Sequence, residues 1–465
     1  MREVLSFIQS ILSTPAIFVG LIAMVGLLLQ KSDVQTTITG TIKTILGFIV
    51  LSAGADVITG SLTPFGDLFQ IAFGVNGVVP NNEAITSLGL TKYAVETASI
   101  FALGMCANIV MARFSKWKYI FLTGHHALYM SCLISIILSI AGLDGWKLIM
   151  GGALLLGTVM AFFPAIMQPS MNKLTGDDSL SLGHFASCCY WLSAQIGKLA
   201  GKSAQKKNKE IKSTEEINFP KGLSFLRDNT VSIALVMFLC YIIVAGKAEF
   251  TGGKQVADIF GDTNWVVFSV IQSVTFSAGI YIVLAGVRLI IAEIVPAFRG
   301  ISEKIVPNAK PAIDCPIVFP FAPNAVLIGF LCSFVGGIVG LALLILAGKA
   351  GLAVALILPG AVVHFFCGAT AGVFGNAEGG IKGCVAGAFV HGIAVTFLAA
   401  ALLPVLGSFG FANTTFSDAD FTIVGIIFGN LAKYVSANGL FAIIIVIFAL
   451  PILYNYTFGK KQNRK

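Results

Sequence analysis

The sequence predicts an all-α polytopic membrane protein, and three features of the chain carry that prediction. Of its 465 residues 56% are hydrophobic, and only 11% are charged. Soluble domains carry roughly 25% charged residues, so this composition excludes a water-soluble protein. Long apolar runs separated by short polar segments are the third feature, and they are typical of a chain that crosses a bilayer repeatedly.

A spanning helix needs about 20 apolar residues, and about eleven runs meet this requirement. They lie near 10–30, 40–60, 94–114, 118–142, 146–166, 229–247, 265–295, 315–347, 352–372, 381–406 and 436–457. The first run, Pro15 to Leu29, is interpreted as a transmembrane helix because no small-residue cleavage site follows it. The less apolar segments 62–90 and 184–200 are expected to form interfacial or re-entrant helices.

One polar linker divides the chain. We expect a membrane half over 1–201, a basic cytoplasmic linker over 202–228, a second membrane half over 229–458 and a basic tail over 459–465. Eight of the 30 basic residues fall between Lys198 and Arg227, and four more lie in the tail. The positive-inside rule therefore places the 198–227 loop and the C-terminus in the cytoplasm, and it explains the net charge of +8 without a nucleic-acid partner.

The two halves share a faint pattern. Residues 54–65 and 292–307 each follow an apolar run and combine an acidic residue with Gly and Pro. Inverted repeats are common in secondary transporters, so we expect such repeats here. The apolar run near residue 360 is interrupted by Pro359-Gly360, and broken backbone at membrane depth survives only where it is buried or lines a cavity.

Ionisable residues inside apolar sequence indicate where a polar solute binds. His125 and His126 follow Gly124, His184 follows Gly183, and Asp314 precedes a run rich in proline. Imidazole and carboxylate groups suit a ligand rich in hydroxyls. Each also has a structural alternative. His125 and His126 could be satisfied by a neighbouring carbonyl, His184 could be a surface histidine at the interface, and Asp314 could cap the start of its span.

Other polar residues are assigned structural roles. We expect His364 and His391 to stabilise helix packing, and Arg288 and Glu293 to form an internal ion pair. The chain contains no P-loop and no H-E-x-x-H or other convincing metal-ligand spacing. We therefore expect no bound metal and no cofactor, and any phosphoryl chemistry must reside in another polypeptide.

Six segments of the chain resemble one known family. They are GTIKTILGFIVLSAG (40–54), LTGH (122–125), SLGH (181–184), AGVRLIIAEI (285–294), AIDC with FAPNAV (312–326), and a segment over 359–380 that opens with PG and contains FF and GVF. Together they resemble the ascorbate-specific membrane component, enzyme IIC, of the bacterial phosphotransferase system. The matches occur in order and extend over most of the chain.

The resemblance implies a homodimer in the bacterial inner membrane. Each protomer would have a core domain that carries the substrate and a V-shaped domain that forms the dimer contact, both drawn from the two halves, and the core would move as an elevator. It implies that a separate enzyme IIB, phosphorylated by IIA upstream, phosphorylates the substrate. The family's substrate-binding residues correspond to His125, His184 and Asp314, with His126 a plausible neighbour.

The pocket departs from the family pattern at three positions. Tyr129 and Phe185 stand where the family has glutamine, and Glu83, beside Ala84, aligns loosely with a family tyrosine. The absence of these two glutamines removes hydrogen-bond donors and acceptors from the substrate pocket. A Glu83 facing the pocket would also disfavour an anion such as ascorbate, because like charges repel strongly at low dielectric. We therefore expect the substrate to be L-ascorbate or a related sugar or polyol.

Two alternatives remain open from the sequence. In the first, Asp314 and the histidines bind a proton or Na⁺, and the chain is an ion-coupled secondary transporter. In the second, His and Asp residues hold a metal in an intramembrane enzyme, which motif spacing does not favour.

Overall fold

The computed structural model describes residues 11, 14–73, 78–80, 82–206, 210–217, 229–251, 254–304, 306–407 and 414–459. Helices make up most of these ranges, and the named strands contain only two to four residues each. The helical content and the apolar composition of the long helices agree with the predicted class, a helical membrane protein.

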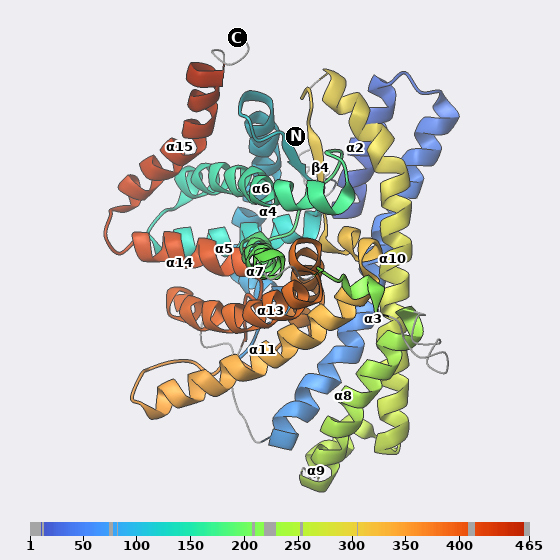
Figure 1. Cartoon of the computed structure of the whole chain (residues 1–465). Coiled ribbons are helices and arrows are strands. Elements are labelled where there is room, and N and C mark those ends of the chain that lie inside the picture. Colours follow the sequence, from blue (N-terminus) through green and yellow to red (C-terminus); the bar gives the residue numbers. More distant parts are fainter. Residues whose placement is uncertain are drawn as a thin grey trace.

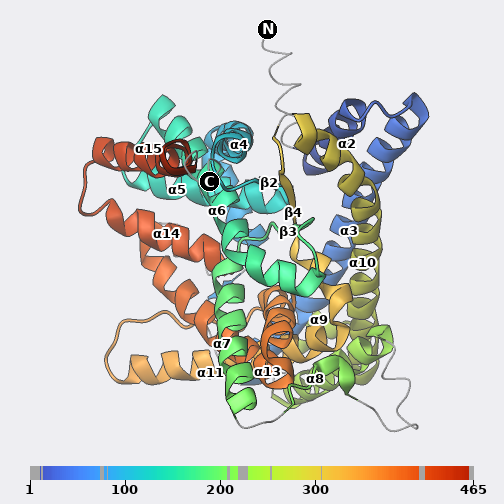
Figure 2. The ribbon, with the colours of Figure 1, turned by 45° about the horizontal axis from the view of Figure 1, so that its top comes forward.

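One group of helices forms an elongated layer, seen on the right of Figures 1 and 2. It consists of α2 (Pro15–Leu29), α3 (Val34–Phe73), α8 (Asn229–Thr251), α9 (Lys254–Phe260) and α10 (Trp265–Lys304). Helices α3 and α10 contain 40 residues each and pack against one another. Asp33 marks the start of α3, since its Oδ1 accepts a hydrogen bond from the Thr36 amide at 2.7 Å.

The remaining helices form a second, broader group on the left of Figure 1. Its long members are α4 (Asn82–Phe114), α5 (Gly124–Ile140), α6 (Gly145–Thr175), α7 (Ser187–Lys206), α11 (Pro323–Lys349), α13 (Ala369–Leu402), α14 (Ala419–Leu431) and α15 (Ala437–Tyr454). Helix α7 packs closely on α13. The two backbones are so near that a Cβ added to Gly379 would lie 2.2 Å from the Gly197 carbonyl oxygen. Only residues without side chains allow these two backbones to approach so closely.

A sheet of three short parallel strands lies between the two groups (Figure 2), and a second pair of strands lies elsewhere. Strand β4 (Lys310–Ile313) pairs with both β2 (Tyr119–Phe121) and β3 (Ser181–Leu182), while β1 (Val79–Pro80) pairs with β5 (Thr414–Thr415). A strand of the C-terminal half thus lies between two strands of the N-terminal half. Because the three strands are parallel, the residues that follow each of them emerge at the same edge.

Three short helical segments complete the second group. They are η3 (Cys315–Phe321) after β4, α12 (Ala361–Val363), and the π-helical turn η4 (His364–Gly368) that leads into α13. Two 3-10 turns, η1 (Thr214–Glu216) and η5 (Leu403–Val405), and a π turn, η7 (Asn455–Gly459), lie elsewhere. A π-helical turn inside a long helix is frequently found at functional sites.

Five helical segments in the described part of the chain are long and apolar enough to cross a membrane. They are Val95–Phe114, Gly145–Thr175, Pro323–Lys349, His364–Val405 and Ala437–Thr457. These five belong to the described part of the chain alone, so the expected total of eleven spans and the inverted repeats stay predictions. The division at 202–228 also stays a prediction.

One stretch differs from its sequence-based assignment. No helix covers residues 351–360; instead the Leu358 amide donates to the Val78 carbonyl at 2.9 Å, and the Val78 amide donates to the Leu356 carbonyl at 2.8 Å. These bonds satisfy backbone groups that a spanning helix would satisfy internally, and Pro359 has no amide hydrogen to continue them. Most of the 184–200 segment belongs to α7, which contacts α13 and α6, and its assignment as an interfacial or re-entrant helix stays a prediction.

Candidate functional site

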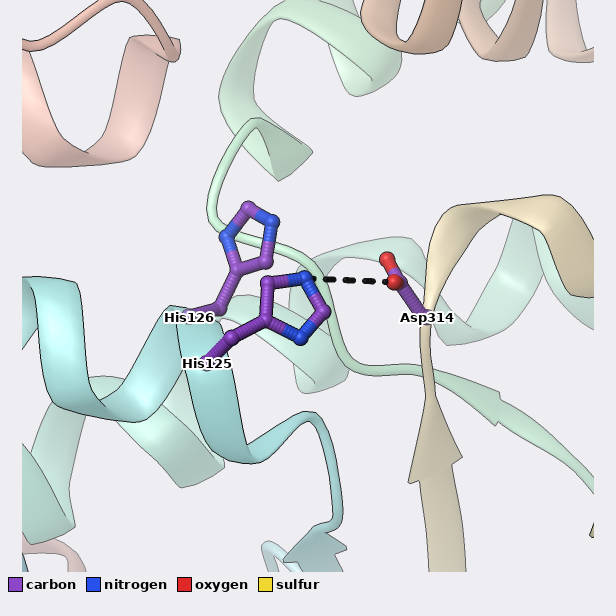
Figure 3. A group of neighbouring side chains, drawn as sticks. All are labelled: His125, His126 and Asp314. Carbon is purple, nitrogen blue, oxygen red and sulfur yellow. Dashed lines mark ion pairs between the residues drawn. The ribbon is translucent and has the colours of Figure 1, made fainter. Parts of the chain in front are cut away.

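Two adjacent histidines open helix α5. Strand β2 ends at Phe121, and His125 and His126 occupy the first turn of the helix that begins at Gly124. The Leu122 amide donates to the Ala312 carbonyl at 2.9 Å, which fixes the start of this helix against β4. Nε2 of His125 lies 3.5 Å from Oδ2 of Asp314, the contact drawn in Figure 3.

His184 reaches the same place from a different strand. It follows Gly183, whose amide donates to the Ile313 carbonyl at 2.7 Å. A Cβ on Gly183 would lie 2.3 Å from the Ala312 carbonyl oxygen, so the close approach of β3 and β4 requires glycine here. Nδ1 of His184 is 2.7 Å from Oδ1 of Asp314, where the ring N–H donates to the carboxylate.

Asp314 stands at the point where β4 becomes η3. Its Oδ1 accepts a hydrogen bond from the Cys315 amide at 2.6 Å and so caps the helical turn that follows. The predicted alternative, a capping role, therefore coexists with the contacts to His125 and His184. The side chain of Asp314 is 12% exposed and that of His125 is 30% exposed, so both are more accessible than His184, whose side chain is 4% exposed.

A second carboxylate, not predicted from the sequence, belongs to the cluster. Asp418 precedes α14, and its Oδ2 lies 3.4 Å from Nε2 of His184 and 4.0 Å from Nε2 of His126. Its Oδ1 accepts from the Ser417 hydroxyl at 2.6 Å, and the Ser417 amide donates to Asn82 Oδ1 at 2.9 Å. An Asp immediately before an apolar helical run is an N-cap signal that could have indicated this position.

Asp420, two residues further along α14, holds the beginning of α7. Its carboxylate accepts from the Ser187 amide at 2.7 Å and from the Cys188 amide at 2.9 Å, while its own amide donates to the Phe185 carbonyl at 3.0 Å. These three bonds anchor the turn that carries His184. A carboxylate that accepts exposed amides at a helix N-terminus also interacts favourably with the helix dipole.

Aromatic side chains enclose the histidines. The ring of His126 stacks on Phe421 with centroids 5.5 Å apart, and the Tyr129 ring lies 5.9 Å from His125. Phe185 is fully buried and stacks on Phe121 at 4.6 Å. Phe185 therefore packs into the apolar wall beneath the cluster, where the family pattern has an amide.

Two of the predicted site residues are only partly placed. Glu83 and Ala84 lie in the first turn of α4, next to Asn82, but their side chains fall outside the described part of the structure. The side chains of Arg288 and Glu293 in α10 fall outside it as well. The predicted roles of these four residues therefore stay predictions.

His364 and His391 do not join the cluster of contacts around Asp314. Each turns its Nδ1 toward the hydroxyl of Ser333, at 2.8 Å for His364 and 2.9 Å for His391. A hydroxyl can donate to one ring and accept from the other. This buried bridge joins α11, η4 and α13, which fits the expected structural role.

The cluster has the donor types that a divalent cation uses. Three overlapping sets bring their ligand atoms within 4.8 Å of one another: His125, His126 and Asp314; His126, His184 and Asp418; and His184, Asp314 and Cys315. Imidazole nitrogen and carboxylate oxygen are common zinc ligands. The rings of His126 and His184 have centroids only 3.9 Å apart. The expectation that no metal binds stays a prediction.

Helix beginnings and strand ends thus gather ionisable side chains inside an apolar helical protein. This arrangement, together with the apolar helices that are long enough to span a bilayer, defines a multi-pass membrane protein with an interior polar site. Residues 10–420 match the family described as the PTS system sugar-specific permease component, and the chain belongs to this family.

One curated relative supports the same family. It is the "Ascorbate-specific PTS system EIIC component" of Mycoplasma pneumoniae, which is 27% identical to this chain over 426 aligned residues. The alignment covers 81% of this chain and 63% of the relative, so the chain spans less than two thirds of the relative's length.

Proposed function

We propose that the chain is the membrane permease subunit, enzyme IIC, of a phosphotransferase system and that it translocates L-ascorbate or a related sugar or polyol. The observation that carries this proposal is the convergence of His125, His184 and Asp314 in a member of the sugar-specific permease family. The exposed faces of His125 and Asp314 offer donors and acceptors to sugar hydroxyls, while His184 fixes the Asp314 carboxylate from behind.

The substrate pocket in this proposal includes the surrounding residues. His126, Tyr129 and Phe185 supply its wall, and Glu83 and Ala84 at the start of α4 border it. The hydrogen bond from the Ser417 amide to Asn82 supports this position for α4, because Ser417 is adjacent to Asp418.

The transport mechanism in this proposal is an elevator movement within a homodimer. The broad group that contains α5, α7, α11 and α13 would be the moving core, and the layer of α2, α3, α8, α9 and α10 would be the V-shaped dimer domain. The mixed origin of both groups from the two halves of the chain supports this division. The 198–227 loop and the C-terminus would face the cytoplasm, where a separate phosphorylated IIB acts.

The test is uptake into proteoliposomes that contain the purified protein. We expect labelled substrate to accumulate only when phosphorylated IIB is present inside, and a His125→Ala variant to accumulate none. Accumulation driven by an imposed proton or Na⁺ gradient without IIB would establish the alternative, an ion-coupled secondary transporter. The two carboxylates beside His184, those of Asp314 and Asp418, are the observation that favours testing this alternative.

A further inference from the structure

His126 is a buried histidine whose ring nitrogens are not accounted for by hydrogen bonds. Its side chain is only 5% exposed, and its Nδ1 has no hydrogen-bond partner among the described residues. Its Nε2 lies 4.0 Å from Oδ2 of Asp418, which is beyond hydrogen-bond distance. A buried polar group without a partner calls for an explanation, such as a ligand held by one of its nitrogens.

Three other donor atoms gather on the Nε2 side of His126. Nε2 of His184 lies 3.4 Å from Oδ2 of Asp418, and Sγ of Cys367 lies 3.5 Å from the same His184 nitrogen. The ligand atoms of His126, His184 and Asp418 all lie within 4.8 Å of one another. At zinc–ligand bond lengths, neighbouring donors of a tetrahedron are about 3.4–3.6 Å apart. Two of the measured separations match this spacing, and the 4.0 Å separation needs a shift of about half an ångström.

Neighbouring residues orient two of these donors. Nδ1 of His184 donates to Oδ1 of Asp314 at 2.7 Å, which leaves the lone pair of its Nε2 free for a metal. A carboxylate that holds the far nitrogen of a histidine is the usual outer partner of a metal ligand. Oδ1 of Asp418 accepts from the Ser417 hydroxyl at 2.6 Å, so Oδ2 remains available.

Burial and charge both suit a closed structural site. The residue Cys367 is 1% exposed, and the side chains of His184 and Asp418 are 4% and 5% exposed. Four protein ligands leave no open coordination position, as in structural rather than catalytic zinc sites. The Asp418 carboxylate and the Cys367 thiolate, formed by release of one proton on binding, would neutralise the two charges of the ion.

We propose that four buried residues bind one structural zinc ion beneath the substrate site: His126, His184, Cys367 and Asp418. They belong to α5, the turn before α7, η4 and the turn before α14, so the ion fastens four separate segments together. The proposal goes beyond the permease function and does not depend on it. It departs from the expectation of no metal, because ligands so far apart in the chain form no local spacing motif.

The test is metal binding to tag-free, purified full-length protein, measured without substrate or IIB. In competition with a chromophoric chelator, we expect one Zn²⁺ per chain, and Zn²⁺ should raise the unfolding temperature. Co²⁺ in the same site should give the intense visible bands of tetrahedral coordination and a near-ultraviolet thiolate-to-cobalt charge-transfer band. Cys367→Ser should lose this band and bind Zn²⁺ about a hundredfold more weakly, roughly a quarter of the free energy of a four-ligand site.

The matched control is Cys384→Ser, which changes another buried cysteine whose thiol contacts the Ala325 carbonyl and none of the four proposed ligands. It should keep the affinity and the charge-transfer band of the wild type. Wild-type protein that binds neither ion, or a cobalt spectrum without the thiolate band, overturns the proposal. Folded Cys367→Ser with the zinc affinity of the wild type overturns it as well. If Cys367→Ser does not fold, the wild-type cobalt spectrum decides alone.

Discussion

Nδ1 of His184 lies 2.7 Å from Oδ1 of Asp314, although 130 residues separate them in the chain. The pairing of the parallel strands β3 and β4 produces this contact. The two strands end side by side, so His184 and Asp314, which follow them, lie at the same edge of the sheet. The contact between these two side chains therefore depends on the register of β3 against β4.

Replacing Asp314 tests the proposed binding role. Asp314→Asn keeps an oxygen that can accept from the Cys315 amide but removes the charge facing His184 and His125. We expect substrate affinity to fall about tenfold to hundredfold, the range for hydrogen bonds to charged groups, and Asp314→Ala to abolish binding. Calorimetry on protein whose folded state is checked by gel filtration measures both. Normal affinity in both variants would refute the assignment.

Gly183→Ala tests how tightly β3 must approach β4. The new methyl group would lie 2.3 Å from the Ala312 carbonyl oxygen, so the strands must separate and carry His184 away from Asp314. We expect a loss of about 1–3 kcal/mol in stability and weaker substrate binding. Thermal unfolding in detergent checks this. Gly60→Ala in α3 is the control, because nothing lies within 4 Å of its added methyl group.

Asp420→Ala should destabilise the start of α7. It leaves the Ser187 and Cys188 amides without their acceptor in a buried setting, and each such loss costs about 1–3 kcal/mol. Asp420→Asn, which retains one acceptor oxygen, should be intermediate. Unfolding temperature and tryptic cleavage within α7 are the measurements. Equal stability of all three proteins would contradict the anchoring role.

Ser333→Ala should affect stability without affecting substrate affinity. The buried rings of His364 and His391 would lose the hydroxyl that bridges them, with an expected cost of about 2–4 kcal/mol. A folded variant with normal stability and altered substrate affinity would instead place this bridge in the transport machinery. Parallel unfolding and binding measurements on the same preparation separate the two results.

Glu83→Gln tests whether the start of α4 contributes charge to the pocket. If the Glu83 carboxylate faces the solute, removing it should raise ascorbate affinity, because one like charge is lost. The readout is the ascorbate dissociation constant at neutral pH, compared with that of Asp33→Asn, which removes one carboxylate from an exposed helix cap. An unchanged constant would place Glu83 outside the pocket.

Much of the site could be predicted from local sequence. His125, His184 and Asp314 each stand in uncommon short motifs at the end of an apolar or strand segment, and the structure brings them together. Asp418 was missed because α14 has only 13 residues, too few to register as a spanning run. The unwound stretch before Pro359 was missed because its composition is as apolar as that of a helix.

The sequence alone determined the class of the protein and the residue types available for binding. Composition decides that the chain must bury its backbone in helices within a bilayer, since unsatisfied peptide groups are too costly there. Only the tertiary structure determined which ionisable side chains lie next to one another. The pairing of β2, β4 and β3 and the packing of α14 against the start of α7 place two carboxylates around one imidazole. Contacts between residues so distant along the chain depend on strand register and helix packing, which local patterns do not encode.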